Sequence, residues 1–142
     1  MKKRILALGL LFLSSFLAGC GNDLKYKVVP FAGTITYQGQ PLGEPVLIVF
    51  TPAAGRPSSA IADANGRFKA EYTERHTGVQ IGKQTVTISP HGTSSGFQTP
   101  GMLNHSASSE KAREAFAKYA FGGQGYSFEV DKKSSNYQLD LP

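Results

Sequence analysis

Hydrophobic and polar residues alternate along most of this chain, in short runs that are separated by turn residues. The alternating runs are residues 31–37, 68–72, 85–88, 126–130 and 137–141. A two-residue period with many β-branched and aromatic side chains is typical of half-buried β-strands. Residues 46–50 read VLIVF and are apolar on both faces, which predicts an interior strand. With about seven strands at short spacing, we expect an all-β, antiparallel β-sandwich.

Turns are predicted where polar residues, Gly and Pro separate these runs, including one at residues 38–41. Asp63, Asn65 and Gly66 belong to a hairpin turn, in which Asn and Gly tolerate left-handed backbone. The last two alternating runs, 126–130 and 137–141, have a polar turn between them. They read as a closing hairpin.

One short helix is expected at residues 110–119. Ser108 or Ser109 can cap it, and Glu110 suits its positive first turn. Apolar side chains share one face of this helix: Ala112, Phe116 and Tyr119. The preceding residues, 91–109, are rich in Gly, Ser, Thr, Asn and Pro. A loop of this length is usually either functional or mobile.

The N-terminus has the pattern of an export signal. Three basic residues, Lys2, Lys3 and Arg4, precede an apolar run at 5–13, which is too short to span a membrane. Residues 17–20, LAGC, resemble the bacterial lipobox. This similarity implies a lipoprotein signal peptide at 1–19, a lipidated Cys20 with a short tether at 20–27, and a folded domain at 28–142. The alternative is an ordinary signal with an incidental cysteine.

The lipobox implies a location in the bacterial cell envelope. Acyl chains on Cys20 would hold the chain on a bilayer, because more than one acyl chain gives stable anchoring. Gly21 follows the cysteine, and this resembles lipoproteins that are sorted to the outer membrane. We therefore expect the domain in the periplasm or on the surface, with the outer membrane favoured over the inner.

Charge and cysteine content narrow the function further. The formal net charge is +5, but removal of residues 1–19 leaves 12 basic against 10 acidic side chains. No long basic run remains to follow a phosphate backbone, so a nucleic-acid partner is not expected. Cys20 is the only cysteine, which excludes an intramolecular disulfide.

Four stretches resemble the carboxypeptidase regulatory-like domain. They are GTITYQGQPL at 33–42, VLIVFTP at 46–52, ADANGRF at 62–68 and IGKQTVTI at 81–88. The resemblance extends from about Val29 to Leu141 and is shared with small secreted lipoproteins of planctomycete bacteria. It implies a transthyretin-like β-sandwich that acts as a non-catalytic accessory or binding module. Gln84 departs from the pattern where the family often has an aromatic residue, which would loosen that face of the sheet.

No metal or cofactor is expected. A calcium loop needs a regular series of oxygen ligands, and Arg67 with Phe68 interrupts the series that Asp63 begins. The histidines, His76, His91 and His105, lack the spacing of a zinc site. A site assembled from distant residues stays open, because His91 and His105 share one loop.

Enzymatic activity is not expected either. No serine lies in a strained turn with a histidine and a carboxylate as partners. The transthyretin-like hydroxyisourate hydrolases end in Y-R-G-S, whereas this chain ends in NYQLDLP. Hydrolysis is thus a remote alternative.

The sequence favours a membrane-anchored, non-catalytic envelope lipoprotein that acts as a structural or protein-interaction module. The alternative is a glycan- or peptide-binding module that uses the loop at 91–109 and nearby aromatic residues. The possible ligand contacts are His91, Phe97, His105, Tyr119, Phe121 and Tyr126.

Overall fold

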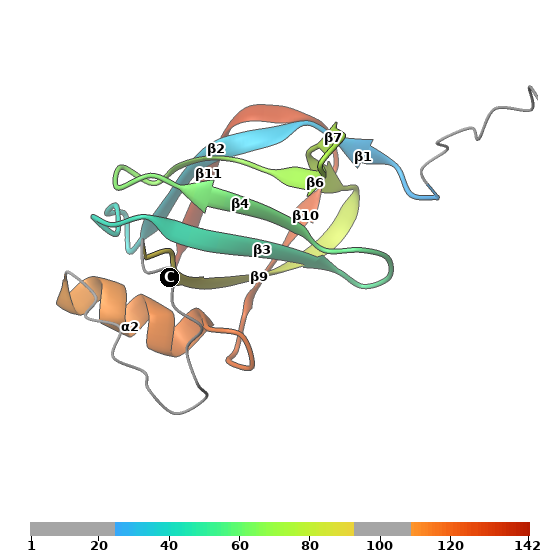
Figure 1. Cartoon of the computed structure of the whole chain (residues 1–142). Coiled ribbons are helices and arrows are strands. Elements are labelled where there is room, and N and C mark those ends of the chain that lie inside the picture. Colours follow the sequence, from blue (N-terminus) through green and yellow to red (C-terminus); the bar gives the residue numbers. More distant parts are fainter. Residues whose placement is uncertain (1–24, 93–108) are drawn as a thin grey trace, which may run out of the picture.

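The chain folds as a β-sandwich with one short helix at an end (Figure 1). The computed structural model describes residues 25–92 and 109–142, and within these ranges it contains eleven strands and one helix. The all-β prediction with one short helix is confirmed for this part of the chain. There are more strands than the seven expected, because several are only two or three residues long.

Two main sheets and one small sheet make up the fold. The six-stranded sheet has the order β10-β9-β3-β4-β6-β7 and consists of β3 (Val46–Pro52), β4 (Ser58–Ala62), β6 (Glu71–Thr73), β7 (His76–Thr77), β9 (Gly82–Pro90) and β10 (Tyr126–Val130). The three-stranded sheet has the order β11-β2-β5 and consists of β2 (Phe31–Tyr37), β5 (Arg67–Lys69) and β11 (Ser134–Leu141). The small sheet pairs β1 (Val28–Val29) with β8 (Val79–Gln80).

The interior strand was predicted correctly. β3 lies between β4 and β9 and is antiparallel to both. Its inward side chains, Val46, Ile48 and Phe50, are completely buried, while Leu47 and Val49 on the outer face are partly exposed. Burial on one face and cross-strand contacts on the other explain why this strand is apolar throughout.

The predicted closing hairpin is wrong. β10 pairs with β9 in the six-stranded sheet, whereas β11 runs parallel to β2 in the three-stranded sheet. Both strands have the expected alternation, but they belong to opposite sheets, and each faces the core from its own sheet. The loop at 131–133 therefore joins the two sheets at their edges, and the sandwich contains one parallel strand pair.

The turn at residues 63–66 also joins the two sheets. The Asp63 carbonyl accepts from the Gly66 amide at 2.8 Å, and the Asp63 carboxylate accepts from the amides of Asn65 and Arg67 at 2.9 Å each. These bonds form the expected tight turn. However, β4 before it belongs to the six-stranded sheet and β5 after it to the three-stranded sheet, so the flanking strands are not a hairpin within one sheet.

The helix α2 (Glu110–Tyr119) has the predicted bounds and closes one end of the sandwich (Figure 1). The Ser109 hydroxyl caps it by accepting from the Ala112 amide at 3.1 Å. Its buried face packs against β9 and β2 and consists of Ala112, Ala115, Phe116 and Tyr119. Among the described residues no helix is long and apolar enough to cross a membrane.

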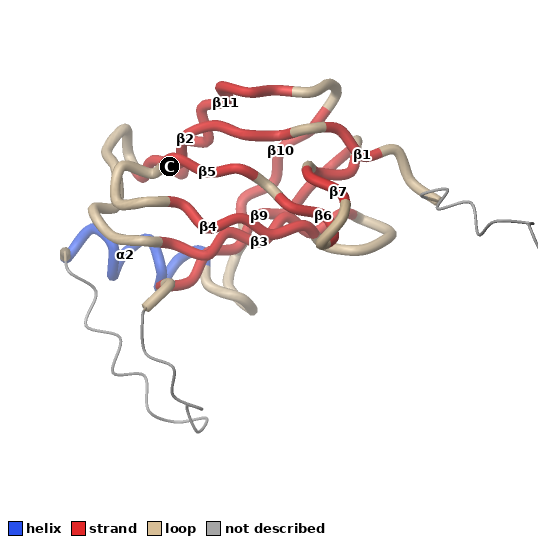
Figure 2. The backbone as a smooth tube through the Cα atoms, turned by 45° about the horizontal axis from the view of Figure 1, so that its top comes forward, coloured by secondary structure: helices blue, strands red, loops and turns tan. Residues whose placement is uncertain are grey.

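The opposite end, which we call the tether end, receives the chain from the N-terminal segment. Here lie residues 25–27, the β3–β4 loop at 53–57, the β6–β7 turn at 74–75 and the β10–β11 loop at 131–133. The antiparallel pairing of β3, β4 and β6 brings the β3–β4 loop and the β6–β7 turn to this end. Phe31 pairs with Ser134, and so the β10–β11 loop lies there too. Figures 1 and 2 show these segments at the right-hand end of the molecule.

Candidate functional site

Three partly exposed aromatic side chains form a row along one side of the sandwich. We call Tyr126, Phe128 and Tyr137 the aromatic row. The Tyr126 and Phe128 rings are nearly parallel, at 14°, with centroids 6.5 Å apart, and the Phe128 and Tyr137 centroids are 5.4 Å apart. Tyr137 also lies 4.9 Å from Phe31, which belongs to the core. The row therefore extends the aromatic core to the surface.

The row lies between two edge strands. β10 is the last strand of the six-stranded sheet, and β11 is the last strand of the three-stranded sheet. In the described part of the chain, no strand pairs with the outer edge of either one. On the other side of the sandwich the chain passes from β5 through Ala70 directly into β6, which connects the sheets. Both sides of the sandwich thus carry a direct chain connection between the sheets, and the aromatic row lies on the side that the loop at 131–133 joins.

Tyrosine hydroxyl groups give the row polar character. Burial raises the pKa of Tyr137, and the nearby Tyr126 and Asp131 raise it further. The Tyr137 hydroxyl therefore keeps its proton at neutral pH and can both donate and accept a hydrogen bond. Such an arrangement can bind an apolar group on the rings while a hydroxyl contacts a polar atom beside it.

Tyr119 is not available as a ligand contact, and this corrects the prediction. Only 2% of the residue is exposed, its ring packs edge-on against Tyr37 at 6.3 Å, and its hydroxyl donates to the Pro142 carbonyl oxygen at 2.5 Å. Helical spacing had placed Tyr119 on the apolar face with Phe116, and that face turns out to be the one that packs on the sandwich.

The remaining predicted contacts are dispersed. Phe121 is 94% exposed just after the helix, and His91 is exposed just after β9. Tyr126 belongs to the aromatic row, and no ring contact joins it to Phe121 in the described residues. Phe97 and His105 lie outside the described residues. The structure thus brings Tyr126 together with residues that the sequence had not singled out.

Phe128 and Tyr137 were missed as site residues. Each was placed correctly in an alternating strand, but alternation alone makes an aromatic residue look like part of the core. What exposes them is their position at the two sheet edges. The predicted hairpin would have placed β10 and β11 side by side in one sheet. With that pairing, neither strand would have been expected at the edge of a separate sheet.

The described residues do not assemble an evident reaction centre. Within residues 25–92 and 109–142, no three His, Cys, Asp or Glu side chains gather where they could hold a metal ion. His76 Nδ1 lies 3.1 Å from the Thr73 hydroxyl, a local contact within the β6–β7 turn. Gln84 is completely buried, and its Nε2 donates to the Gln80 carbonyl at 2.7 Å. Its Oε1 has no hydrogen-bond partner among the described residues, and a buried acceptor without a partner destabilises the fold.

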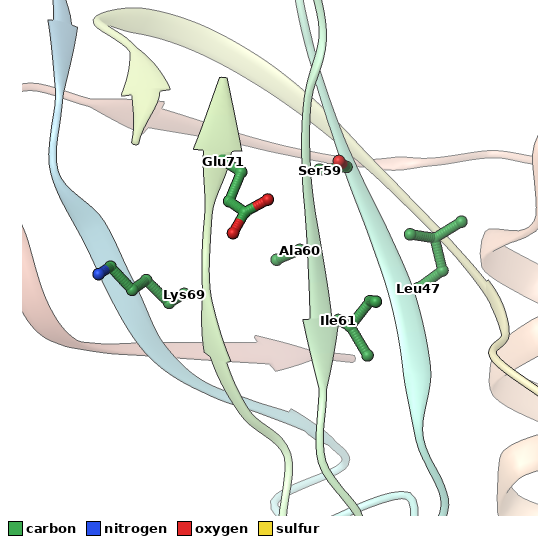
Figure 3. Close-up of a pocket in the computed structure, with 6 residues that line it drawn as sticks. All are labelled: Leu47, Ser59, Ala60, Ile61, Lys69 and Glu71. Carbon is green, nitrogen blue, oxygen red and sulfur yellow. The ribbon is translucent and has the colours of Figure 1, made fainter. Parts of the chain in front are cut away.

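A hollow of about 240 Å³ lies on the outer face of the six-stranded sheet (Figure 3). Leu47 and Ile61 are direct cross-strand neighbours there, and Ile61 is 55% exposed. Glu71 reaches toward β4, whereas the Lys69 side chain points away from it. The hollow thus combines two apolar side chains with the charged residues Lys69 and Glu71.

No family model, curated protein or solved structure matches this chain.

Proposed function

We propose that this protein is a non-catalytic, lipid-anchored lipoprotein of the bacterial cell envelope, whose β-sandwich binds an extended segment of another protein. The observation on which this rests is the partly exposed aromatic row between two edge strands. The lipobox-like residues 17–20 supply the anchor through Cys20. The transthyretin-like form of the sandwich, as in carboxypeptidase regulatory-like domains, is part of the proposal.

An extended polypeptide fits this surface in two respects. The outer edges of β10 and β11 offer backbone groups that can pair with an added strand. The Tyr126 and Phe128 centroids are 6.5 Å apart, which is close to the two-residue repeat of a β-strand of about 6.6–6.8 Å. Alternate side chains of an extended partner would therefore meet successive rings. Tyrosine is also among the residues that are enriched at the binding hot spots of protein interfaces.

A glycan is the second candidate. Its support is the near-parallel orientation of the Tyr126 and Phe128 rings, because parallel rings can stack on the apolar faces of successive sugars. The loop at 91–109 remains a candidate contributor to either kind of site, although 93–108 lie outside the described residues. Hydrolysis remains a remote third proposal without an assembled site.

Chemical cross-linking in intact envelopes, followed by purification of the protein and identification of attached chains, tests the proposal. The variant Tyr126→Ser/Tyr137→Ser removes two rings of the row, and we expect it to lose at least about tenfold of any specifically cross-linked partner. Phe121→Ser is the matched control, since Phe121 is an exposed aromatic residue away from the row. Circular dichroism and urea unfolding verify that each variant is folded.

The outcomes separate the candidates. A protein retained by the wild type and by Phe121→Ser but lost by the double variant supports the proposed function. Equal cross-linking in all three proteins would place the interaction elsewhere. Retention of purified envelope polysaccharide, lost in the double variant, would favour the glycan instead.

A further inference from the structure

Exposed basic side chains gather at the tether end of the sandwich. They come from four separate segments: the N-terminal segment, the β3–β4 loop, the β6–β7 turn and the β10–β11 loop. The members are Lys25, Lys27, Arg56, Arg75, Lys132 and Lys133. Only two acidic side chains, Glu74 and Asp131, lie in the same segments.

The rest of the described domain lacks this excess. Outside the tether end, residues 25–92 and 109–142 contain six basic and seven acidic side chains. The positive charge of the folded domain is therefore concentrated at one end. None of the six basic side chains forms a salt bridge with a described residue; the ion pair reported in this part of the chain joins Arg67 to Asp63. Lys25 lies over the Tyr26 ring, 5.5 Å from its centroid, and keeps its charge exposed.

The N-terminal segment is fixed to this end by several contacts. The Ile81 amide donates to the Lys27 carbonyl at 2.9 Å, and Val28 and Val29 pair with β8. The Tyr26 ring lies so close to the β3–β4 loop that a Cβ added at Gly55 would be 3.0 Å from it. Where the chain leaves the fold is thus determined by packing.

The proposed anchor is close in sequence to this surface. Cys20 precedes Lys25 by five residues, which can span at most about 17 Å when fully extended. Attraction between a basic surface and anionic lipid is effective within about one Debye length, roughly 8–10 Å at physiological salt. A short tether therefore holds the basic end near the range in which it interacts with headgroups.

We propose that the tether end docks on anionic phospholipid headgroups. The inference rests on the proposed lipid anchor and adds an orientation to it. Docking would hold the sandwich upright on the bilayer, with α2 at the end farthest from the lipid and the aromatic row facing sideways. The partner is a bilayer and not a polynucleotide because the same end carries the tether.

Energy transfer in proteoliposomes tests the orientation. The lipidated protein receives a donor fluorophore either at Ala53→Cys in the β3–β4 loop or at Ala64→Cys in the turn at 63–66, and acceptor lipids are added to the vesicles. Vesicles contain either phosphatidylcholine alone or about 30% phosphatidylglycerol. We expect transfer from position 53 to be higher in the anionic vesicles and to fall in 0.5 M NaCl, while position 64 stays farther from the lipid.

Charge reversal identifies the surface. Lys132→Glu/Lys133→Glu changes the charge by four units at the tether end, and we expect the ratio of docked to undocked protein to fall at least about tenfold. Lys111→Glu/Arg113→Glu makes the same change at exposed positions of α2 and should leave docking nearly unchanged. Urea unfolding of each variant controls for stability.

Two results would overturn the proposal: equal transfer from position 53 in neutral and anionic vesicles, or equal losses in the two charge-reversed variants. The mass of the N-terminal peptide shows separately whether Cys20 is acylated. If Cys20 is acylated but transfer is the same in neutral and anionic vesicles, docking is refuted and the lipid anchor is not. If Cys20 is not acylated, the anchor itself is refuted.

Discussion

At the scale of single residues, Asp140 shows how one exposed carboxylate ties two elements together. Its Oδ1 accepts from the Thr36 hydroxyl at 2.7 Å and from the Gly39 amide at 2.8 Å. The hydrogen bond from the Gly39 amide, and secondly the one from the Thr36 hydroxyl, lower the pKa of Asp140 below its usual value near 3.8. The carboxylate thus fastens the turn after β2 to the end of β11.

A lowered pKa has a predictable effect on stability. Because the folded protein holds the proton less tightly than the unfolded chain does, the ionised form stabilises the fold above about pH 4, and this contribution is lost as the pH falls through the folded pKa. We expect Asp140→Asn to lower the free energy of unfolding at pH 7 by less than about 1 kcal/mol, since the site is exposed. The two proteins should converge as the pH falls below the lowered pKa of Asp140.

Urea midpoints at pH 7, 5 and 3 measure this difference. Asparagine keeps an oxygen that can accept the same two hydrogen bonds, so the comparison isolates the charge. A difference that stays constant across this pH range would show that the charge of Asp140 contributes nothing.

At the scale of elements, the parallel pair of β2 and β11 depends on a close approach at Gly33. The register between these strands shifts between Ser134 and Tyr137, which marks an irregularity in β11. A Cβ added at Gly33 would lie 2.0 Å from the Tyr137 carbonyl oxygen, a backbone atom that cannot move aside alone. Gly33 thus permits β11 to pack against β2 at the position that aims Tyr137 into the aromatic row.

Replacement of this glycine should be destabilising. A Gly-to-Ala change within an ordinary strand stabilises by roughly 0.5–1 kcal/mol, because glycine loses more entropy on folding. At Gly33 we expect the opposite sign, a loss of at least about 2 kcal/mol in urea unfolding, because the strands must separate. Gly92→Ala is the control, since a Cβ there would meet no atom within 4 Å. A Gly33→Ala protein as stable as the wild type would contradict this account of the strand pair.

At the scale of the whole molecule, the proposed lipid anchor decides where the domain acts. We expect Cys20→Ala to abolish acyl labelling and to release the mature protein from washed membranes, because acyl chains would supply most of its membrane affinity. Gly21→Ser, next to the cysteine, should retain both the label and the membrane location. Metabolic labelling with a fatty acid and fractionation measure the two effects. Unchanged labelling of Cys20→Ala would exclude this anchor.

The candidate site was only partly predictable. Tyr126 was identified from the sequence, but Phe128 and Tyr137 resembled core residues, because their two-residue period is that of any half-buried strand. Tyr119 was expected at a binding surface and instead lies on the buried face of α2. In each case the residue's environment depends on which element covers it, and this is a property of long-range contacts.

The sequence by itself determined the local structure: the alternating strands, the interior strand at 46–50, the turn at 63–66 and the helix with its Ser109 cap. These features depend on side-chain periodicity, turn geometry and capping, all of which act over a few residues. Only the tertiary structure decided that β10 and β11 belong to different sheets and that basic loops meet at the tether end. The alternation of a strand shows which face is apolar, but it does not show which strand lies next to it. That pairing depends on how the two sheets bury their apolar faces against each other.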